Sequence, residues 1–131
     1  MFPADPYLKF RVRQLCETVN AAIQPLQNIS VIKKIENEYS GDGAEWARYF
    51  ITKGLGSYEM LLQETKGKYS VGDEVTAADA FLLPQLFNAN RYKIDVSQFP
   101  LICEVAENLN QIEEIKQAHP ANMPDTPEDE K

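Results

Sequence analysis

The sequence predicts an all-α fold of about five or six helices. Its 131 residues are enough for one domain with a single hydrophobic core. Apolar residues recur three and four positions apart in several long stretches, which is the spacing of one helix face. No stretch alternates apolar and polar residues as a half-buried strand does. We therefore expect residues 1–131 to form one helical bundle, with residues 118–131 as a tail that lies along the surface or is disordered.

The first helix is predicted to begin after Pro6 and to bury one face. Pro25 removes a backbone N–H and crowds the preceding turn, so the helix should kink or restart around residues 24–30 and resume at residues 31–35. The apolar face of this stretch comprises Val12, Leu15, Cys16, Val19, Ala22, Ile23 and Leu26.

A second long helix is predicted from the turn that contains Asp42 and, three residues later, Glu45. It should end at the sequence Lys-Gly-Lys of residues 66–68. Gly54 and Gly56 lie inside it and each weakens a helix by about 1 kcal/mol relative to alanine, so we expect another backbone to pack closely there. The apolar stripe comprises Ala44, Ala47, Ile51, Leu55, Tyr58 and Leu62.

Residues 76–92 are predicted to form the central helix of the core. Apolar residues occur on nearly every face of this helix, which is typical of a fully buried helix. Pro84 lies in its interior and should bend it. Thr76 precedes the helix and Asp79 is its third residue, which is the spacing of a capping box. Because this cap accounts for both residues, it is favoured over a catalytic acid at Asp79. The apolar residues include Ala80, Phe81, Leu82, Leu83, Leu86 and Phe87.

The last helical stretch follows Pro100 and should break near Asn110 before Ile115. His119 and Pro120 should end it, with His119 acting as a cap rather than a base because no nucleophile lies near it in sequence. One face of this stretch carries Ile102, Val105, Leu109 and Ile112.

Composition excludes several function classes. The formal charge of −7 disfavours nucleic acid as a partner. Cys16 and Cys103 are far apart and His119 is the single histidine, so no metal site is expected, and Cys16 should pack as a small hydrophobe. The sequence shows neither a signal peptide nor an apolar run long enough for a membrane span, which predicts a cytoplasmic protein with reduced thiols.

Two features are candidates for binding an anion. The interruption at residues 24–30 exposes backbone N–H groups where a carboxylate could dock, although a plain kink capped by Asn28 or Ser30 is the simpler interpretation. Arg91 ends the central helix, where a guanidinium suits both the helix dipole and a carboxylate ligand. A solvated surface arginine is the alternative.

Four segments carry a resemblance that covers nearly the whole chain: IQPLQN, VGDEVTAAD, NANRYKID and PDTP. Together they resemble the C-terminal helical domain of zeta-class glutathione transferases, the maleylacetoacetate isomerases. VGDEVTAAD is shared across the glutathione transferase superfamily, whereas the other three are more particular to the zeta class.

The resemblance implies a function. It assigns contacts with glutathione to Gln24, Asn28, Ile29 and Ser30, and it assigns to Arg91 the carboxylate of the organic substrate. The implied reaction is the glutathione-dependent cis–trans isomerisation of maleylacetoacetate to fumarylacetoacetate in tyrosine and phenylalanine catabolism, and the class also has transferase activity. The resemblance further implies a homodimer whose interface includes the first two long helices.

Members of this family begin with a thioredoxin-like domain that activates the glutathione thiol, and these 131 residues do not supply it. Residues 1–6 resemble the linker that follows that domain, so we expect the chain to start at a domain boundary and to be inactive by itself. The alternative is a non-catalytic interaction module that needs no glutathione, as in the related domains of translation factors and synthetase complexes.

Overall fold

The structure is a computed structural model that describes residues 1–127. Its helices are α1 (Pro6–Asn20), α2 (Ile29–Tyr39), α3 (Gly43–Thr65), α4 (Ala77–Arg91), α5 (Pro100–Leu109) and α6 (Glu113–Gln117), with short 3-10 helices η1 (Val96–Gln98) and η2 (Pro120–Asn122). Among the described residues there is no strand, so the predicted all-α class is confirmed. The last four residues of the predicted tail, 128–131, lie outside the described part.

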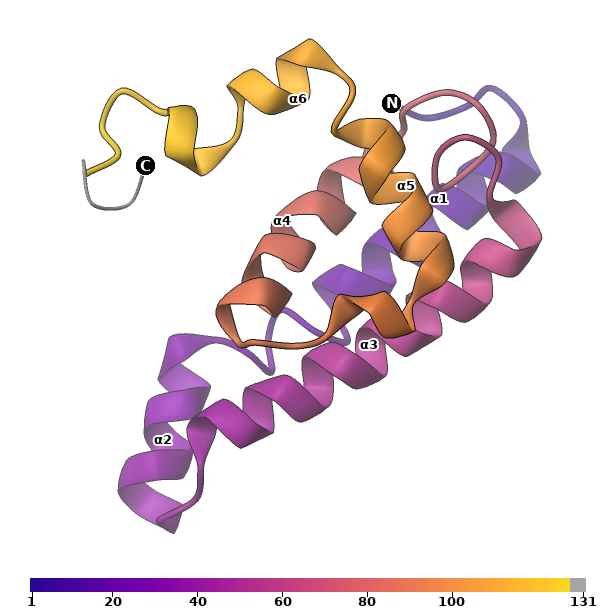
Figure 1. Ribbon diagram of the computed structural model, residues 1–131. Helices are drawn as coiled ribbons and strands as arrows, with labels where there is room; N and C mark the ends of the chain where they lie inside the picture. Colours follow the sequence, from indigo (N-terminus) through magenta and orange to yellow (C-terminus); the bar gives the residue numbers. More distant parts are fainter. Residues whose placement is uncertain (128–131) are drawn as a thin grey trace.

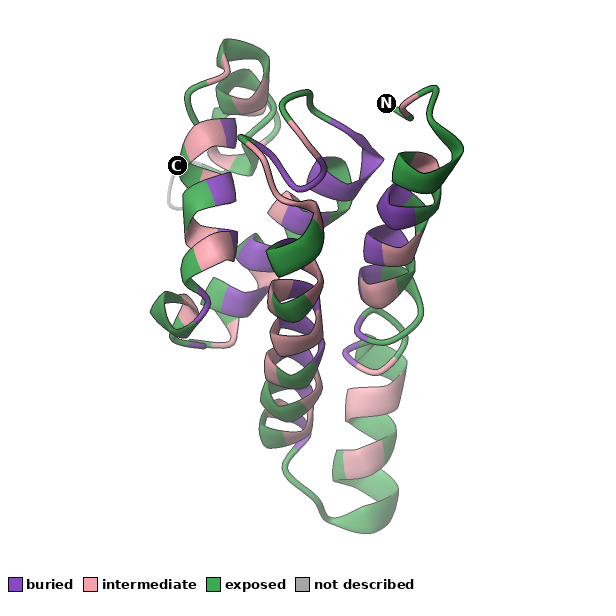
Figure 2. Ribbon diagram, turned by 90° about the vertical axis from the view of Figure 1, so that its right-hand side faces the viewer, coloured by how far each residue is buried: buried purple, intermediate pink, exposed green. Residues whose placement is uncertain are grey.

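The long helix α3 is the axis of the bundle (Figure 1). Helix α1 packs against both α3 and α4, and α5 packs against α3. Helix α2 packs mainly along the first part of α3 and contributes no fully buried residue, as its exposed and half-buried surface in Figure 2 shows. Within the described residues, no helix is long and apolar enough to cross a membrane.

The predicted interruption of the first helix is confirmed, although it begins at residue 21 and not at the predicted residue 24. Helix α1 ends at Asn20, residues 21–27 form turns, and α2 begins at Ile29. Ile23 remains fully buried, but Ala22 is exposed, so its predicted place on the buried face is wrong. The helical spacing that linked Ala22 to the face of α1 no longer holds once the chain has left the helix.

Helix α3 begins and ends as predicted. The Asp42 Oδ1 atom accepts a hydrogen bond from the Glu45 backbone N–H at 2.8 Å. The expected close approach at its glycines is only partly found. A Cβ atom on Gly54 would lie 2.2 Å from Cγ1 of Ile23, so a side chain and not a backbone needs the space, whereas Gly56 has no neighbour closer than 3.9 Å.

Helix α4 begins with the predicted cap. The Asp79 Oδ2 atom accepts hydrogen bonds from the backbone N–H of Thr76 at 2.7 Å and from its hydroxyl at 3.0 Å. The other carboxylate oxygen of Asp79 accepts from the backbone N–H of Ser70 at 2.9 Å. The cap therefore also fixes the loop between α3 and α4.

The expectation that α4 is buried on all sides is wrong. Phe81 is 41% exposed and Phe87 is 49% exposed. Helix α4 packs against α1, α3 and η1, and these neighbours leave both phenylalanines exposed. Helix α4 runs without a break through Pro84.

The break between α5 and α6 falls at Asn110, as predicted. Helix α5 has no side-chain cap of its own at its start; instead, the Glu59 carboxylate of α3 accepts hydrogen bonds from the N–H groups of Leu101 at 2.8 Å and Ile102 at 2.9 Å. His119 is the N-cap of η2, and its Nδ1 atom accepts from the Ala121 N–H at 3.2 Å.

Candidate functional site

The turn segment that carries the first candidate residues is attached to α4 by side-chain amides. Gln24 Nε2 donates to Gln85 Oε1 at 3.0 Å, and Gln27 Nε2 donates to the same oxygen at 3.0 Å. Gln85 Nε2 donates in return to Gln27 Oε1 at 3.1 Å. Trp46 Nε1 of α3 donates to the Leu26 carbonyl at 3.0 Å and fixes the segment from a second side.

Asn28 is the N-cap of α2. Its Oδ1 atom accepts from the backbone N–H of Ser30 at 2.9 Å and from the Ser30 hydroxyl at 2.7 Å. The N–H of Ile29, the first helical residue, has no acceptor within the helix. Ile29 is 62% exposed, so this helix start is open to solvent and its partial positive charge can attract an anion.

Arg91 is the last residue of α4 and is exposed. Among the described residues, no carboxylate lies within ion-pairing distance of its guanidinium. The chain turns away directly after it through Lys93, whose φ angle is +58°. The guanidinium is therefore available to a ligand.

Gln85 and Arg91 belong to the same helix, six residues apart, which is about 9 Å along the helix axis. The structure thus connects Gln24 to the helix that carries Arg91. It does not place Gln24, Asn28, Ile29, Ser30 and Arg91 around one of the clefts described next.

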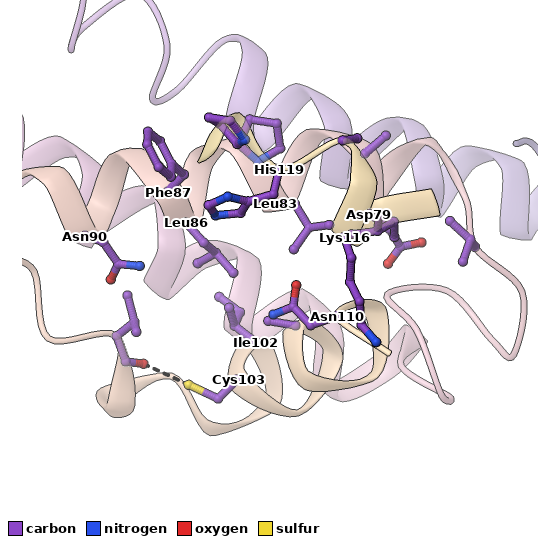
Figure 3. A pocket seen from close by; sticks show the side chains of 18 of the residues that line it. Asp79, Leu83, Leu86, Phe87, Asn90, Ile102, Cys103, Asn110, Lys116 and His119 are labelled. Atoms are coloured by element: carbon purple, nitrogen blue, oxygen red, sulfur yellow. Dashed lines mark hydrogen bonds between the residues drawn. The ribbon is translucent and has the colours of Figure 1, made fainter. Parts of the chain in front are cut away.

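A cleft of about 890 Å³ lies on the uncovered side of α4, between α4, α5 and the segment from Ile115 to Asn122 (Figure 3). Its walls are mainly apolar, and Asn90, Asn110, Lys116 and His119 add polar groups. A second, smaller cleft lies beside Phe87 and His119, whose rings meet edge to face with their centroids 6.0 Å apart. Sequence reasoning missed both clefts, because the nearly all-round apolar pattern of α4 was interpreted as that of a fully buried helix. The apolar wall of the larger cleft includes Leu83, Pro84, Leu86, Phe87, Ile102 and Ala106.

Neither thiol has the environment of a nucleophile. Cys103 lines the larger cleft, and its Sγ atom donates to the Val96 carbonyl at 3.3 Å (Figure 3). Burial, with the nearby Glu59 carboxylate, raises the pKa of Cys103, and burial also raises the pKa of Cys16. Both thiols are therefore protonated at neutral pH. Within residues 1–127 there is no cluster of three or more His, Cys, Asp or Glu side chains that could hold a metal ion.

Comparison with known proteins defines the class. The family model described as glutathione S-transferase, C-terminal domain, matches residues 26–118. The chain belongs to this family, as the capped central helix and the all-helical bundle lead one to expect.

Individual relatives narrow the class further. The chain is 42% identical over 127 residues to maleylacetoacetate isomerase of Mus musculus, a match that covers 97% of this chain and 57% of the relative. The crystal structure of maleylacetoacetate isomerase from Anaeromyxobacter dehalogenans 2CP-1, with glutathione bound in its active site, superimposes with a TM-score of 0.93 at 38% identity, covering 96% of this chain and 58% of that one.

A third match is the structure of a bacterial maleylpyruvate isomerase described as a zeta-class glutathione transferase. Its TM-score is 0.90 at 32% identity, with 96% of this chain and 62% of that chain covered. The resemblance to the C-terminal domain of the zeta class is thereby confirmed. The chain spans somewhat more than half the length of the curated relatives that it matches.

Proposed function

We propose that this chain is the substrate-side helical domain of a glutathione-dependent cis–trans isomerase that converts maleylacetoacetate to fumarylacetoacetate. The observation that carries the proposal is the 42% identity to maleylacetoacetate isomerase over 97% of the chain. On this proposal the protein acts in tyrosine and phenylalanine catabolism in the cytoplasm, where reduced thiols are usual, in keeping with two cysteines that form no disulfide.

The proposed glutathione contacts are Gln24, Asn28, Ile29 and Ser30. The open helix start at Ile29 and the polar groups of Asn28 and Ser30 suit a peptide carboxylate, and the Gln24 amide suits a peptide group. The Arg91 guanidinium, which pairs with no carboxylate of residues 1–127, suits a carboxylate of the organic substrate. Exposed apolar side chains on α1 and α3, among them Phe10, Tyr49 and Met60, suit the homodimer that the resemblance implies.

Turnover requires the glutathione thiol to be held and ionised beside the substrate. The two thiols of the described chain, one buried and one half-buried, are protonated, and in the proposed family the thiol-activating groups belong to the thioredoxin-like domain. We therefore expect the 131-residue chain to bind glutathione weakly and not to isomerise maleylacetoacetate by itself.

Glutathione binding can be tested by NMR on the 131-residue chain. Adding reduced glutathione should shift the backbone amides of Gln24, Asn28 and Ser30 together, with one dissociation constant. Asn28→Ala should weaken binding by about fivefold or more, since it removes a polar contact and the cap that orients the helix start.

The matched control is Asp42→Ala, which removes the corresponding cap from α3 and should leave glutathione affinity unchanged. Shifts scattered over the surface, or none, would favour the interaction module and contradict the proposal.

A further inference from the structure

Gln85 is a polar side chain in the middle of the core. It is fully buried on α4, and Gln27 beside it is only 6% exposed. A buried amide is unfavourable unless it is hydrogen bonded. Gln85 meets this requirement entirely through the turn segment, because Oε1 accepts from Gln24 and Gln27 while Nε2 donates to Gln27.

These bonds join parts of the chain that are 58 to 61 residues apart. The segment they hold has no regular secondary structure between Asn20 and Ile29, so its position depends on contacts with the rest of the bundle. Gln24 is exposed yet its amide is directed to a buried acceptor, which restricts its side chain to conformations that reach Gln85.

We propose that Gln85 is a positioning residue for glutathione: its buried amide holds Gln24 and the Gln24–Ser30 segment in the arrangement that binds the ligand. The inference rests on the proposed function above. Gln85 itself does not touch glutathione, since it is fully buried, and it acts through Gln24. Because Gln85 and Arg91 share α4, the same bonds set the position of the glutathione segment relative to the proposed substrate residue.

The first test compares two substitutions on α4 in the 131-residue chain. Gln85→Met keeps the size of the side chain and removes all three hydrogen bonds, whereas Leu82→Ala removes fully buried apolar volume from the same helix. Both should lower the free energy of unfolding. Only Gln85→Met should weaken glutathione binding in the NMR titration, by about fivefold or more, the effect of one net hydrogen bond.

The second test uses the unmodified chain and so does not depend on whether a variant folds. The side-chain amide resonances of Gln24 and of the buried Gln85 should shift during the titration with the same dissociation constant as the backbone of Ser30. A residue with a purely structural role would not respond in this way.

The outcomes separate the two proposals. Glutathione binding that Gln85→Met leaves unchanged, or a Gln85 amide that stays unshifted while Gln24 responds, would overturn the role of Gln85 alone. The absence of any glutathione-dependent shift in the unmodified chain would overturn the proposed function and this inference with it.

Discussion

Asp79→Ala is expected to lower the free energy of unfolding by several kcal/mol, since each buried hydrogen-bond donor left without an acceptor costs about 1 to 3 kcal/mol. Asp79 is fully buried and accepts three hydrogen bonds, from the backbone N–H groups of Ser70 and Thr76 and from the Thr76 hydroxyl. Alanine would leave these donors without their partner. Since small domains are stable by about 5 to 15 kcal/mol, the variant should unfold at a much lower urea concentration, measured by circular dichroism.

Two further variants control for this effect. Asp79→Asn keeps the size and one acceptor oxygen, so its loss should be smaller. Asp95→Ala removes a capping carboxylate from an exposed position, where Asp95 precedes η1 and accepts from the Ser97 N–H at 3.0 Å and from the Ser97 hydroxyl. A loss for Asp79→Ala no larger than that for Asp95→Ala would contradict the role assigned to the buried carboxylate.

Gly54→Ala is expected to destabilise the protein by about 1 to 3 kcal/mol, although alanine favours a helix by about 1 kcal/mol over glycine. The added methyl group would lie 2.2 Å from Cγ1 and 2.5 Å from Cδ1 of Ile23, which is fully buried and has little room to move. Steric overlap therefore outweighs helix propensity at this position. Chemical denaturation measures the difference.

The same contact predicts that substitutions at Gly54 and Ile23 are coupled in their effects on the free energy of unfolding. Ile23→Ala alone should lose about 2 to 5 kcal/mol, because it leaves a cavity. When Ile23→Ala and Gly54→Ala are combined, the methyl group added on α3 occupies part of that cavity, so the combined loss should be smaller than the sum by about 0.5 to 3 kcal/mol. Strictly additive losses would contradict the claim that the Ile23 side chain is what excludes a larger residue at position 54.

The matched control for Gly54→Ala is Gly56→Ala, where the nearest atom is 3.9 Å from the added Cβ, and this change should be neutral or stabilising.

Local signals in the sequence predicted most helix boundaries correctly. The caps at Asp42 and at Thr76 with Asp79 join residues three positions apart, so both partners can be identified from the local sequence. The restart after Pro25 follows in the same way from proline chemistry. The exposed face of α4 could not be predicted, because an apolar helix surface does not reveal which neighbours cover it. Phe81 and Phe87 stay exposed although α4 packs against α1, α3 and η1.

The candidate site, too, could be predicted only in part from the sequence. Helix interruption and an arginine at a helix end marked Gln24–Ser30 and Arg91 as suited to anions, whereas their specific roles come from the resemblance and stay predictions. The bonds from Gln85 to Gln24 and Gln27 are absent from any local pattern, since they span about half the chain. A glutamine among the apolar residues of the central helix was the one available signal.

A chimeric enzyme tests most directly whether these residues act as the substrate-side domain of a maleylacetoacetate isomerase, as proposed above. The 131 residues would replace the matching part of the Mus musculus isomerase, and turnover of maleylacetoacetate with glutathione would be measured. We expect turnover that Arg91→Met reduces at least about tenfold in kcat/KM, as for a lost charged hydrogen bond, while Lys93→Met, a nearby control, has little effect. A folded chimera that binds glutathione and does not isomerise maleylacetoacetate would contradict the account.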